Sequence, residues 1–339
     1  MGMGAAVATA GLTTSASSVQ AQDKPVAPLK VIDFHNHFGG PFTLTTADRI
    51  KIPAAREAQL KTNALLRDPA ALLASLEQTG CSARVINIPT AFLEDADGNV
   101  AKDTTKRIND YVAELAGKNK GKIYSLATVD AFSGDEGARE LTRAVRDLGL
   151  RGVFLESGKG DLLLNAPEAR PTLAVAAQLG IPIFVHPVQD RQMHARFSKT
   201  GPLGARLARA TINSASLLAM LEGGVFDELP QLKVVVTTLA IGGVLMAGGF
   251  GDGRRIRRDT PEQFRRHVYI DTMGLHPALV SSVVDLLGAD HVLAGTDWPI
   301  AVEKEVPARL QKALAVAGLD AAGQQMVASG NALKLLGAS

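Results

Sequence analysis

The sequence predicts an α/β protein built as a single (β/α)₈ TIM barrel, and three observations support this. Eight short apolar runs of strand length alternate with stretches of helical periodicity along the chain. The runs are almost continuously apolar, as expected of parallel strands that are covered on both faces. The length of 339 residues fits one barrel of about 250 residues with extensions. A doubly wound open sheet is the alternative architecture.

The predicted elements follow one another without an internal linker. The first strand, residues 31–34, leads into a polar, irregular stretch that extends to about Arg67. Asp68 and Pro69 then begin a helix with an acidic cap and a first-turn proline, and Gly80 ends it. Seven further strands are expected at Ala83–Ile88, Ile123–Val129, Gly152–Leu155, Ile181–Val185, Leu232–Thr237, Val268–Ile270 and Val292–Ala294. The later helices are expected at Thr104–Ala116, Gly134–Leu148, Ala166–Leu179, Gly204–Glu222, Pro277–Leu287 and, broken near Gly318, Val306–Leu336.

Composition narrows the possible partners. Lysine plus arginine total 36 and aspartate plus glutamate 34, which gives no electrostatic case for nucleic acid or an anionic membrane. Hydrophobic residues make up 46% and aromatic residues only 4%, so a large core must consist mainly of aliphatic side chains. Cys81 is the single cysteine, which excludes an intrachain disulfide. No apolar run reaches the ~18 residues needed to span a membrane.

The N-terminal segment, residues 1–24, is set apart from the barrel at 25–339. It is rich in alanine, glycine, serine and threonine, and Val19-Gln20-Ala21 fits a small-x-small cleavage site. No basic residue precedes Lys24, but the mild hydrophobicity suits a twin-arginine signal whose arginine pair is lost through start-site choice. We therefore expect export to a periplasm, with a disordered tail on a cytoplasmic protein as the alternative.

Histidines end the first strand. His35 and His37 are separated by Asn36, so along a strand both imidazoles point one way and Asn36 the other. Active sites of (β/α)₈ barrels lie at the carboxyl ends of the strands, and other polar residues occur at the corresponding points. These are Asp130, Glu156, His186, Asp271 and Asp297. Three imidazoles and one carboxylate, from His35, His37, His186 and Asp297, suit a divalent metal, zinc first and manganese or iron next.

Four segments carry a family resemblance. They are Ile32-Asp33-Phe34-His35-Asn36-His37, Phe184-Val185-His186-Pro187, Tyr269-Ile270-Asp271-Thr272 and Leu293-Ala294-Gly295-Thr296-Asp297-Trp298-Pro299. In order and context the chain resembles the amidohydrolase superfamily, in the branch of aminocarboxymuconate-semialdehyde decarboxylase (amidohydrolase 2). The resemblance covers about Lys30 to Leu336. It implies that the same four side chains ligate a metal, that Asp297 also touches a metal-bound water, and that the protein forms a homodimer.

One position departs from this family. Its sixth strand normally ends in a histidine followed closely by two glycines, whereas the sequence here runs Val236-Thr237-Thr238-Leu239-Ala240-Ile241-Gly242-Gly243. The histidine position falls on Thr238 when aligned from the left and on Ala240 when aligned on the glycines. Neither side chain accepts a proton near neutral pH, which argues against the decarboxylation chemistry of the branch.

Other residues are candidates for the missing proton acceptor and for substrate contacts. Asp297, Glu156 at the end of the fourth strand and His276 just past the seventh are the catalytic candidates. Thr238, Trp298 and Arg254 are the candidates for substrate binding, since arginine pairs with carboxylates. Equally, Glu156 and His276 fit surface positions, and the arginines around Arg254 fit a solvated face.

The sequence thus favours a metal-dependent hydrolase. We expect it to act on a small ester, lactone or amide through a metal-bound water, because a divalent metal lowers the pKa of bound water to about 7. The first alternative is a non-oxidative decarboxylase of an aromatic or unsaturated carboxylic acid. The second is a barrel with reduced catalytic equipment that only binds a small ligand.

Overall fold

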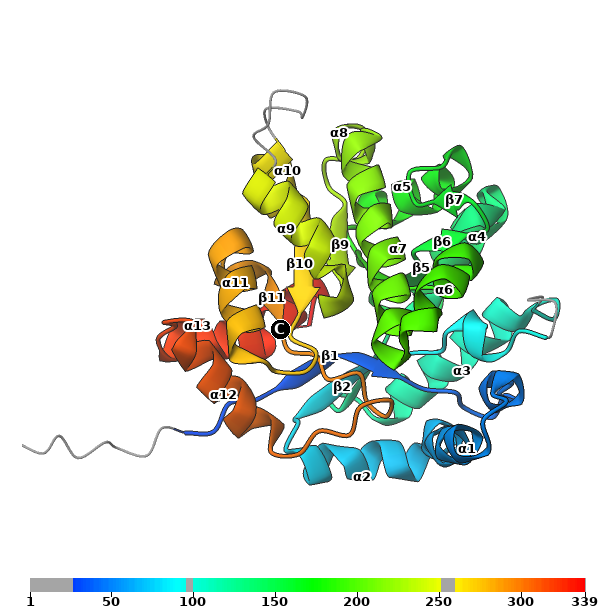
Figure 1. The fold of residues 1–339 in the computed structure, drawn as a ribbon, viewed down its shortest axis with the longest axis horizontal. Helices are drawn as coiled ribbons and strands as arrows, with labels where there is room; N and C mark the ends of the chain where they lie inside the picture. Colours follow the sequence, from blue (N-terminus) through cyan, green and yellow to red (C-terminus); the bar gives the residue numbers. More distant parts are fainter. Residues whose placement is uncertain (1–26, 96–99, 251–259, 339) are drawn as a thin grey trace, which may run out of the picture.

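Eight parallel strands close into a barrel surrounded by helices (Figure 1). The computed structural model describes residues 27–95, 100–250 and 260–338. The barrel strands are β1 (Ile32–His37), β2 (Ala83–Asn87), β3 (Ile123–Ser125) with its continuation β4 (Ala127–Thr128), β5 (Val153–Glu156), β8 (Pro182–His186), β9 (Lys233–Val236), β10 (Val268–Asp271) and β11 (Val292–Leu293). Each predicted strand is present, and the predicted barrel is confirmed.

The barrel closes between β1 and the residues that follow β11. The ladders run β1-β2-β3 and β4-β5-β8-β9-β10-β11, and only Leu126 separates β3 from β4. Three backbone hydrogen bonds complete the circle: Phe34 N to Ala294 O (2.8 Å), Asp297 N to His35 O (2.8 Å) and His37 N to Trp298 O (2.9 Å). Closure therefore places Asp297 directly beside the two histidines of β1.

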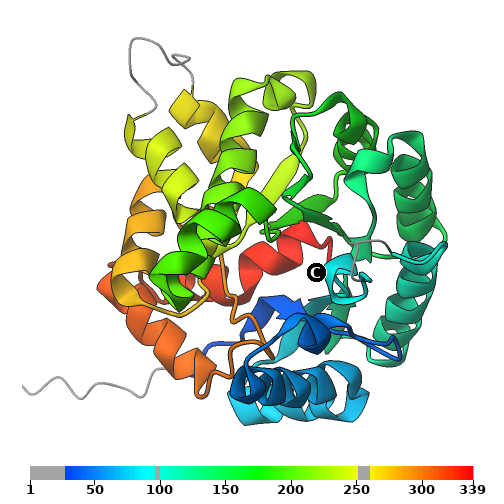
Figure 2. The ribbon, with the colours of Figure 1, turned by 45° about the vertical axis from the view of Figure 1, so that its right-hand side comes forward.

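Helices form the outer layer, and Figure 2 shows them ringed around the strands. They are α1 (Pro53–Arg67), α2 (Pro69–Thr79), α3 (Thr104–Lys118), α4 (Asp135–Arg146), α5 (Arg170–Leu179), α6 (Arg191–Phe197), α7 (Pro202–Glu222), α8 (Val225–Glu228), α9 (Ile241–Phe250), α10 (Thr260–His267), α11 (Pro277–Leu287), α12 (Val306–Val316), α13 (Ala321–Gln325) and α14 (Asn331–Leu335). A short hairpin, β6 (Gly158–Lys159) with β7 (Leu162–Leu163), follows β5.

The prediction of an irregular stretch up to Arg67 is wrong, because residues 53–67 form α1. Only Asn63 and Leu66 of this helix are buried, so it lacks the apolar stripe that reveals a helix in sequence. Pro53 at its first turn and the Lys61–Glu57 pair (2.9 Å) are the local features that suit a helix. The sequence also missed α6, α9 and α10, which are short.

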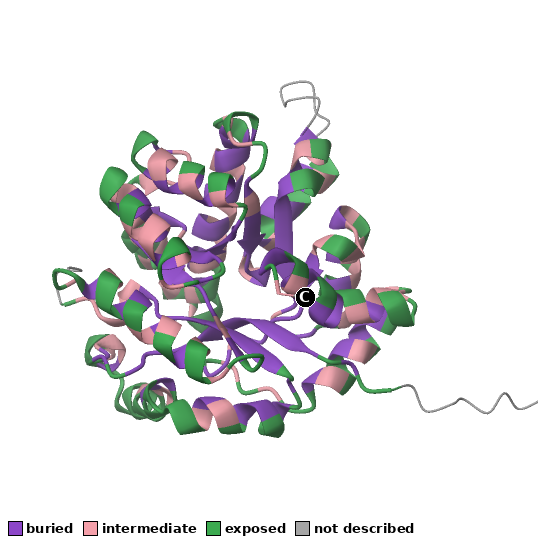
Figure 3. Ribbon diagram, turned by 180° about the vertical axis from the view of Figure 1, so that it is seen from behind, coloured by how far each residue is buried: buried purple, intermediate pink, exposed green. Residues whose placement is uncertain are grey.

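Two buried clusters make up the core, and Figure 3 shows the strands almost wholly buried. The larger cluster fills the layer between strands and helices. The smaller one fills the barrel interior with side chains from seven of the strands, from Leu126 between β3 and β4, and from α14 and the residue after it: Ile32, Phe34, Ala83, Val85, Leu126, Phe154, Phe184, Val235, Tyr269, Leu293, Ala332, Leu335 and Leu336. Phenylalanine rings therefore lie directly beneath the strand ends that carry the histidines.

Some expectations concern parts of the chain that the structure does not describe. The export signal predicted in residues 1–24 and the substrate contact predicted for Arg254 both lie outside the described residues, and both stay predictions. Within the described ranges, no helix has the length and apolar character to cross a membrane.

Candidate metal centre

A bulge in β1 turns both of its histidines toward the barrel interior. In the register of the parallel β1–β2 ladder, Asp33 lies opposite Arg84 and Asn36 lies opposite Ile86. Three residues along β1 therefore correspond to two residues along β2. The extra residue lets Phe34 and His35 face the same side, where both rings contact Phe184 edge-on at centroid distances of 5.8 and 5.1 Å. Without this bulge, strict alternation from Phe34 would point His35 away from the interior.

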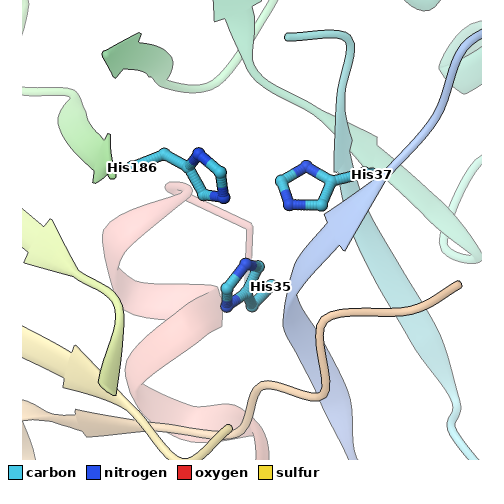
Figure 4. A group of neighbouring side chains, drawn as sticks. All are labelled: His35, His37 and His186. Carbon is cyan, nitrogen blue, oxygen red and sulfur yellow. The ribbon is translucent and has the colours of Figure 1, made fainter. Parts of the chain in front are cut away.

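Three imidazoles converge at the carboxyl ends of β1 and β8 (Figure 4). One nitrogen from each of His35, His37 and His186 lies within 4.8 Å of the others. Asp297 completes the group, with its Oδ1 3.4 Å from His35 Nε2 and 3.2 Å from His37 Nε2. The structure thus brings together three histidine nitrogens and places one Asp297 oxygen beside two of them, while their predicted role as metal ligands stays a prediction.

Neighbouring side chains fix which nitrogen of each β1 histidine faces that point. His35 Nδ1 lies 2.6 Å from Asp271 Oδ2, and His37 Nδ1 lies 3.0 Å from Asn87 Oδ1. Both oxygens are acceptors, so each Nδ1 carries the proton and each Nε2 keeps a free lone pair. Such outer partners orient metal-binding histidines in known sites and raise their basicity.

Gly295 gives His35 and Asp271 the room to approach each other. A Cβ at this position would lie 2.8 Å from Asp271 Cβ and 3.0 Å from His35 Cβ. The glycine that precedes Thr296-Asp297 is therefore required by packing around the histidine–carboxylate pair. Asp297 itself has a positive φ of 67°, which is uncommon outside glycine and is better tolerated by aspartate than by most residues.

Charges in this centre favour a bound cation. Burial lowers the pKa of His186 well below its ordinary value, and the nearby His37 and Arg209 lower it further. Burial alone would raise the pKa of Asp297, but His35, His37 and Arg209 together outweigh it and lower that pKa. A neutral imidazole and an ionised carboxylate are the forms that bind metal ions.

One buried nitrogen indicates that the residues fit a metal. His35 Nε2 is buried and has no hydrogen-bond partner, which is costly unless a bound ligand completes it. Burial would lower the pKa of His35, yet Asp271 and Asp297 outweigh that effect and raise it, so negative charge prevails at this ring. The histidine triad with Asp297 could therefore hold one divalent metal ion.

The other two catalytic candidates lie beside this centre. Glu156 is aligned with His186 on the neighbouring strand, but its Oε1 accepts hydrogen bonds from Thr90 Oγ1 (3.0 Å) and Ala91 N (3.2 Å). Burial, reinforced by the charge of Glu94, raises its pKa to about 7. His276 is exposed at the start of α11 and lines a small cavity together with Thr238 and Asp271. A catalytic role for either residue stays a prediction.

Thr238, one of the two positions aligned with the family's sixth-strand histidine, holds Asp271. Its N donates to Asp271 Oδ1 (2.9 Å), and its Oγ1 lies 2.6 Å from the same oxygen and 2.7 Å from Asp271 O. Ala240, the other aligned position, is fully buried in the core. Thr238 therefore helps to orient His35, because it holds the carboxylate of Asp271 that bonds to His35 Nδ1. The hydroxyl of Thr238, which the sequence assigned to substrate binding, is already used in these hydrogen bonds.

Trp298 was the remaining candidate for substrate contact. Its side chain is only 3% exposed, and the guanidinium of Arg84 lies 5.0 Å from its ring centroid. The structure therefore gives the ring a packing partner and leaves little of its surface for a ligand.

Sequence reasoning missed three residues of this centre. Asp271 was noted as a strand end without a role, and Asn87 and Arg209 were not considered. Asn87 is a polar residue at the carboxyl end of β2, which is a detectable signal, because the carboxyl ends of barrel strands meet. Arg209 lies within the long helix α7, where nothing in the sequence separates it from other arginines.

The protein is a (β/α)₈ barrel whose candidate metal-binding side chains lie at the carboxyl ends of the strands, where barrel enzymes have their active sites. More particularly, the chain belongs to the amidohydrolase family, whose model matches residues 32–338. It is 24% identical to 2-amino-3-carboxymuconate-6-semialdehyde decarboxylase of Dictyostelium discoideum, over 80% of this chain and 77% of that protein. It is 27% identical to gamma-resorcylate decarboxylase of Rhodococcus jostii, over 59% and 67%.

Solved structures show the same fold. 5-Carboxyvanillate decarboxylase from Sphingomonas paucimobilis superposes with a TM-score of 0.77 at 20% identity, over 92% of this chain and 100% of that one. Dihydroxybenzoic acid decarboxylase from a Polaromonas species, which contains manganese and the inhibitor 2-nitroresorcinol, superposes with a TM-score of 0.78 at 19% identity, over 91% and 97%.

These comparisons correct the predicted reaction. A hydrolase acting on an ester, lactone or amide was favoured because Thr238 or Ala240 replaces the family histidine. The relatives and the structural neighbours named above are all decarboxylases, so the carboxy-lyase alternative is the better supported one. The replacement of one histidine was therefore a weaker argument than the relationship to decarboxylases.

Proposed function

We propose that this protein is a metal-dependent, non-oxidative decarboxylase of a small aromatic or unsaturated carboxylic acid. The observation that carries the proposal is the cluster of His35, His37 and His186, with Asp297 Oδ1 beside the first two and His35 Nε2 left without a hydrogen-bond partner. The decarboxylase relatives supply the reaction class. When bound, the metal would supply positive charge that holds the oxygens of the acid and stabilises negative charge on it.

The reaction needs one proton on carbon, and Asp297 is the residue placed to carry it. The bond to the carboxylate breaks, its electron pair stays on the carbon, that carbon takes a proton, and CO₂ leaves. Because its neighbours lower the pKa of Asp297, the resting carboxylate first takes a proton from solvent or from a hydroxyl of the acid. Thr238 and Ala240, the two positions aligned with the family's histidine after β9, have no imidazole that could share this task.

Manganese is the metal to test first, with zinc second. Manganese is bound in the dihydroxybenzoic acid decarboxylase of similar fold. Imidazole and carboxylate donors suit both ions. Protein stripped by a chelator should lose activity and regain it on addition of one equivalent of the correct ion per chain.

The decisive experiment is a screen of acids for CO₂ release. Metal-loaded protein is incubated in D₂O with 2,6-dihydroxybenzoate and 5-carboxyvanillate, two acids that relatives decarboxylate. CO₂ release with one deuterium at the vacated carbon is expected from at least one acid of an extended aromatic panel. Protein that binds one metal per chain yet releases no CO₂ from any acid, while cleaving an ester or lactone, would contradict the proposal.

A further inference from the structure

Arg209 places a positive charge beside the metal donors. It lies on α7, is partly buried, and its Nη2 donates to the carbonyl oxygen of Pro187 (3.3 Å), the residue that follows His186. The charge of Arg209 also lowers the pKa values of His186 and Asp297, in keeping with its contact to the residue after His186.

This guanidinium has no directly bonded carboxylate, unlike two other arginines with limited exposure. Among the described residues, no carboxylate lies within 4.0 Å of its nitrogens, and the single backbone carbonyl leaves most of its five N–H groups unused. By contrast, Arg84 pairs with Asp33 (2.5 Å), and Arg143 pairs with Asp110 (2.7 Å) and Glu140 (2.8 Å). The nearby carboxylate of Asp297 acts on Arg209 only from a longer distance, so its remaining N–H groups are available to a second, directly bound anion.

The fold fixes Arg209 in this place. α7 packs against α6 and α9, and its buried face includes Ala208, Ile212 and Asn213. Asn213 Nδ2 donates to Thr237 Oγ1 (2.9 Å) at the end of β9, which ties this part of the helix to the barrel mouth. Arg209 therefore projects from a rigid element, and a planar guanidinium held in this way suits bidentate binding of a carboxylate.

We propose that the guanidinium of Arg209 binds the carboxylate of the acid substrate at the mouth of the metal centre. This inference rests on the proposed function and makes it more specific, since it assigns the recognition of the acid group to a residue on α7. The metal and Arg209 together then select an acid over the neutral product that remains after CO₂ has left. The competing explanation is structural: Arg209 holds only the Pro187 carbonyl and thereby shapes the loop after β8.

A matched pair of ligands separates these explanations without requiring turnover. Salicylate and phenol share a ring and a hydroxyl and differ only in the carboxylate, and isothermal titration calorimetry on manganese-loaded protein gives both affinities. In the wild type salicylate should bind more tightly. Arg209→Met should reduce the ratio of salicylate to phenol affinity about tenfold or more, as expected for a lost charged hydrogen bond, and Arg209→Lys should restore part of it.

Arg206 provides the control for a mere change in net charge. It lies one turn earlier on α7 and is exposed, so Arg206→Met removes one positive charge and leaves the guanidinium of Arg209 in place. The affinity ratio should stay within about twofold of the wild-type value in this variant. Metal content, measured for every variant, should remain one ion per chain.

Three outcomes would overturn the assignment. They are an Arg209→Met protein that keeps the wild-type affinity ratio, an equal loss in Arg206→Met, and wild-type protein that binds salicylate no more tightly than phenol. The proposed function is judged independently by CO₂ release, so a decarboxylase with an intact ratio in Arg209→Met would refute this inference alone.

Discussion

The two faces of β1 each carry a buried polar cluster, and the clusters differ in how well their atoms are satisfied. On the outer face Asp33 and Asn36 meet Arg84, which is fully buried. Arg84 also donates to Ser75 Oγ (2.9 Å) and Thr79 Oγ1 (3.1 Å), and Asp33 accepts from Thr296 N (2.9 Å) and Oγ1 (2.6 Å). On the inner face His35 and His37 meet His186 and Asp297, and His35 Nε2 has no hydrogen-bond partner.

This difference separates a structural cluster from a functional one. A buried network whose members are all hydrogen-bonded is complete without a ligand and holds the chain in one arrangement. Here the outer network joins β1 and β2 to the loop 295–298, and thereby positions Asp297. In the inner cluster His35 Nε2 has no hydrogen-bond partner, and three histidines with a neighbouring carboxylate form a set that could hold a cation. The combination of donor types, more than burial or a single unbonded atom, distinguishes this candidate site.

The largest expected effect tests the inner cluster. His186→Ala should remove one of the four donors, abolish stoichiometric metal binding and lower decarboxylation by roughly 10³-fold or more. Elemental analysis and the CO₂ assay measure the two effects. His291→Ala, at the amino-terminal end of β11, is the matched control and should retain the metal. If His186→Ala kept both the metal and the activity, the assignment of the site would fail.

Arg84→Met should break the outer cluster and affect stability instead. It leaves the buried Asp33 carboxylate without its cation, which should lower the free energy of unfolding by about 3–5 kcal/mol in urea titrations. The protein that remains folded should still bind one metal ion. Arg266→Met, which removes an exposed helical ion pair, should change stability little. Loss of the metal at unchanged stability would reverse the roles given to the two clusters.

Asp271→Asn tests the connection between Thr238 and the metal donors. The carboxylate that holds His35 Nδ1 becomes an amide, so metal affinity should fall about 10- to 100-fold while the fold is retained. Competition with a chelator of known affinity measures this change. An unchanged affinity would show that His35 does not need Asp271 to present its Nε2.

Glu156→Gln should give the smallest effect, visible as pH dependence. The raised pKa of about 7, against an ordinary value of 4.5, means that the folded protein binds more protons than the unfolded chain between these pH values. Wild-type stability should therefore fall as pH rises from about 4.5 to 7, by about 1–2 kcal/mol once partial solvent access is allowed for.

A glutamine side chain cannot titrate, so the difference in melting temperature between Glu156→Gln and wild type should shift in favour of the variant from pH 5 to pH 8. The metal content of the variant should equal that of the wild type, because Glu156 bonds to Thr90 and Ala91 and lies outside the donor set. Identical pH profiles for the two proteins would show that the carboxyl group is not held in its protonated form.

Much of the fold could be predicted because its signals are local. Apolar runs marked all eight strands, and the periodic helices Thr104–Lys118 and Pro277–Leu287 were found close to their observed bounds. The helix Pro53–Arg67 was missed because a mostly exposed helix has no apolar stripe to detect. An amphipathic sequence pattern shows which face of a helix is buried, so it does not detect a helix that is mostly exposed.

By itself the sequence determined which donors exist and on which strand ends they lie. Only the tertiary structure decided that they meet, since closure of the barrel at β1 and β11 joins segments far apart in the chain. It also decided the bulge that turns His35 inward, the bond from Thr238 to Asp271 and the position of Arg209. The physical reason is range: strand and helix patterns depend on near neighbours, whereas contacts between distant segments exist only in the closed barrel.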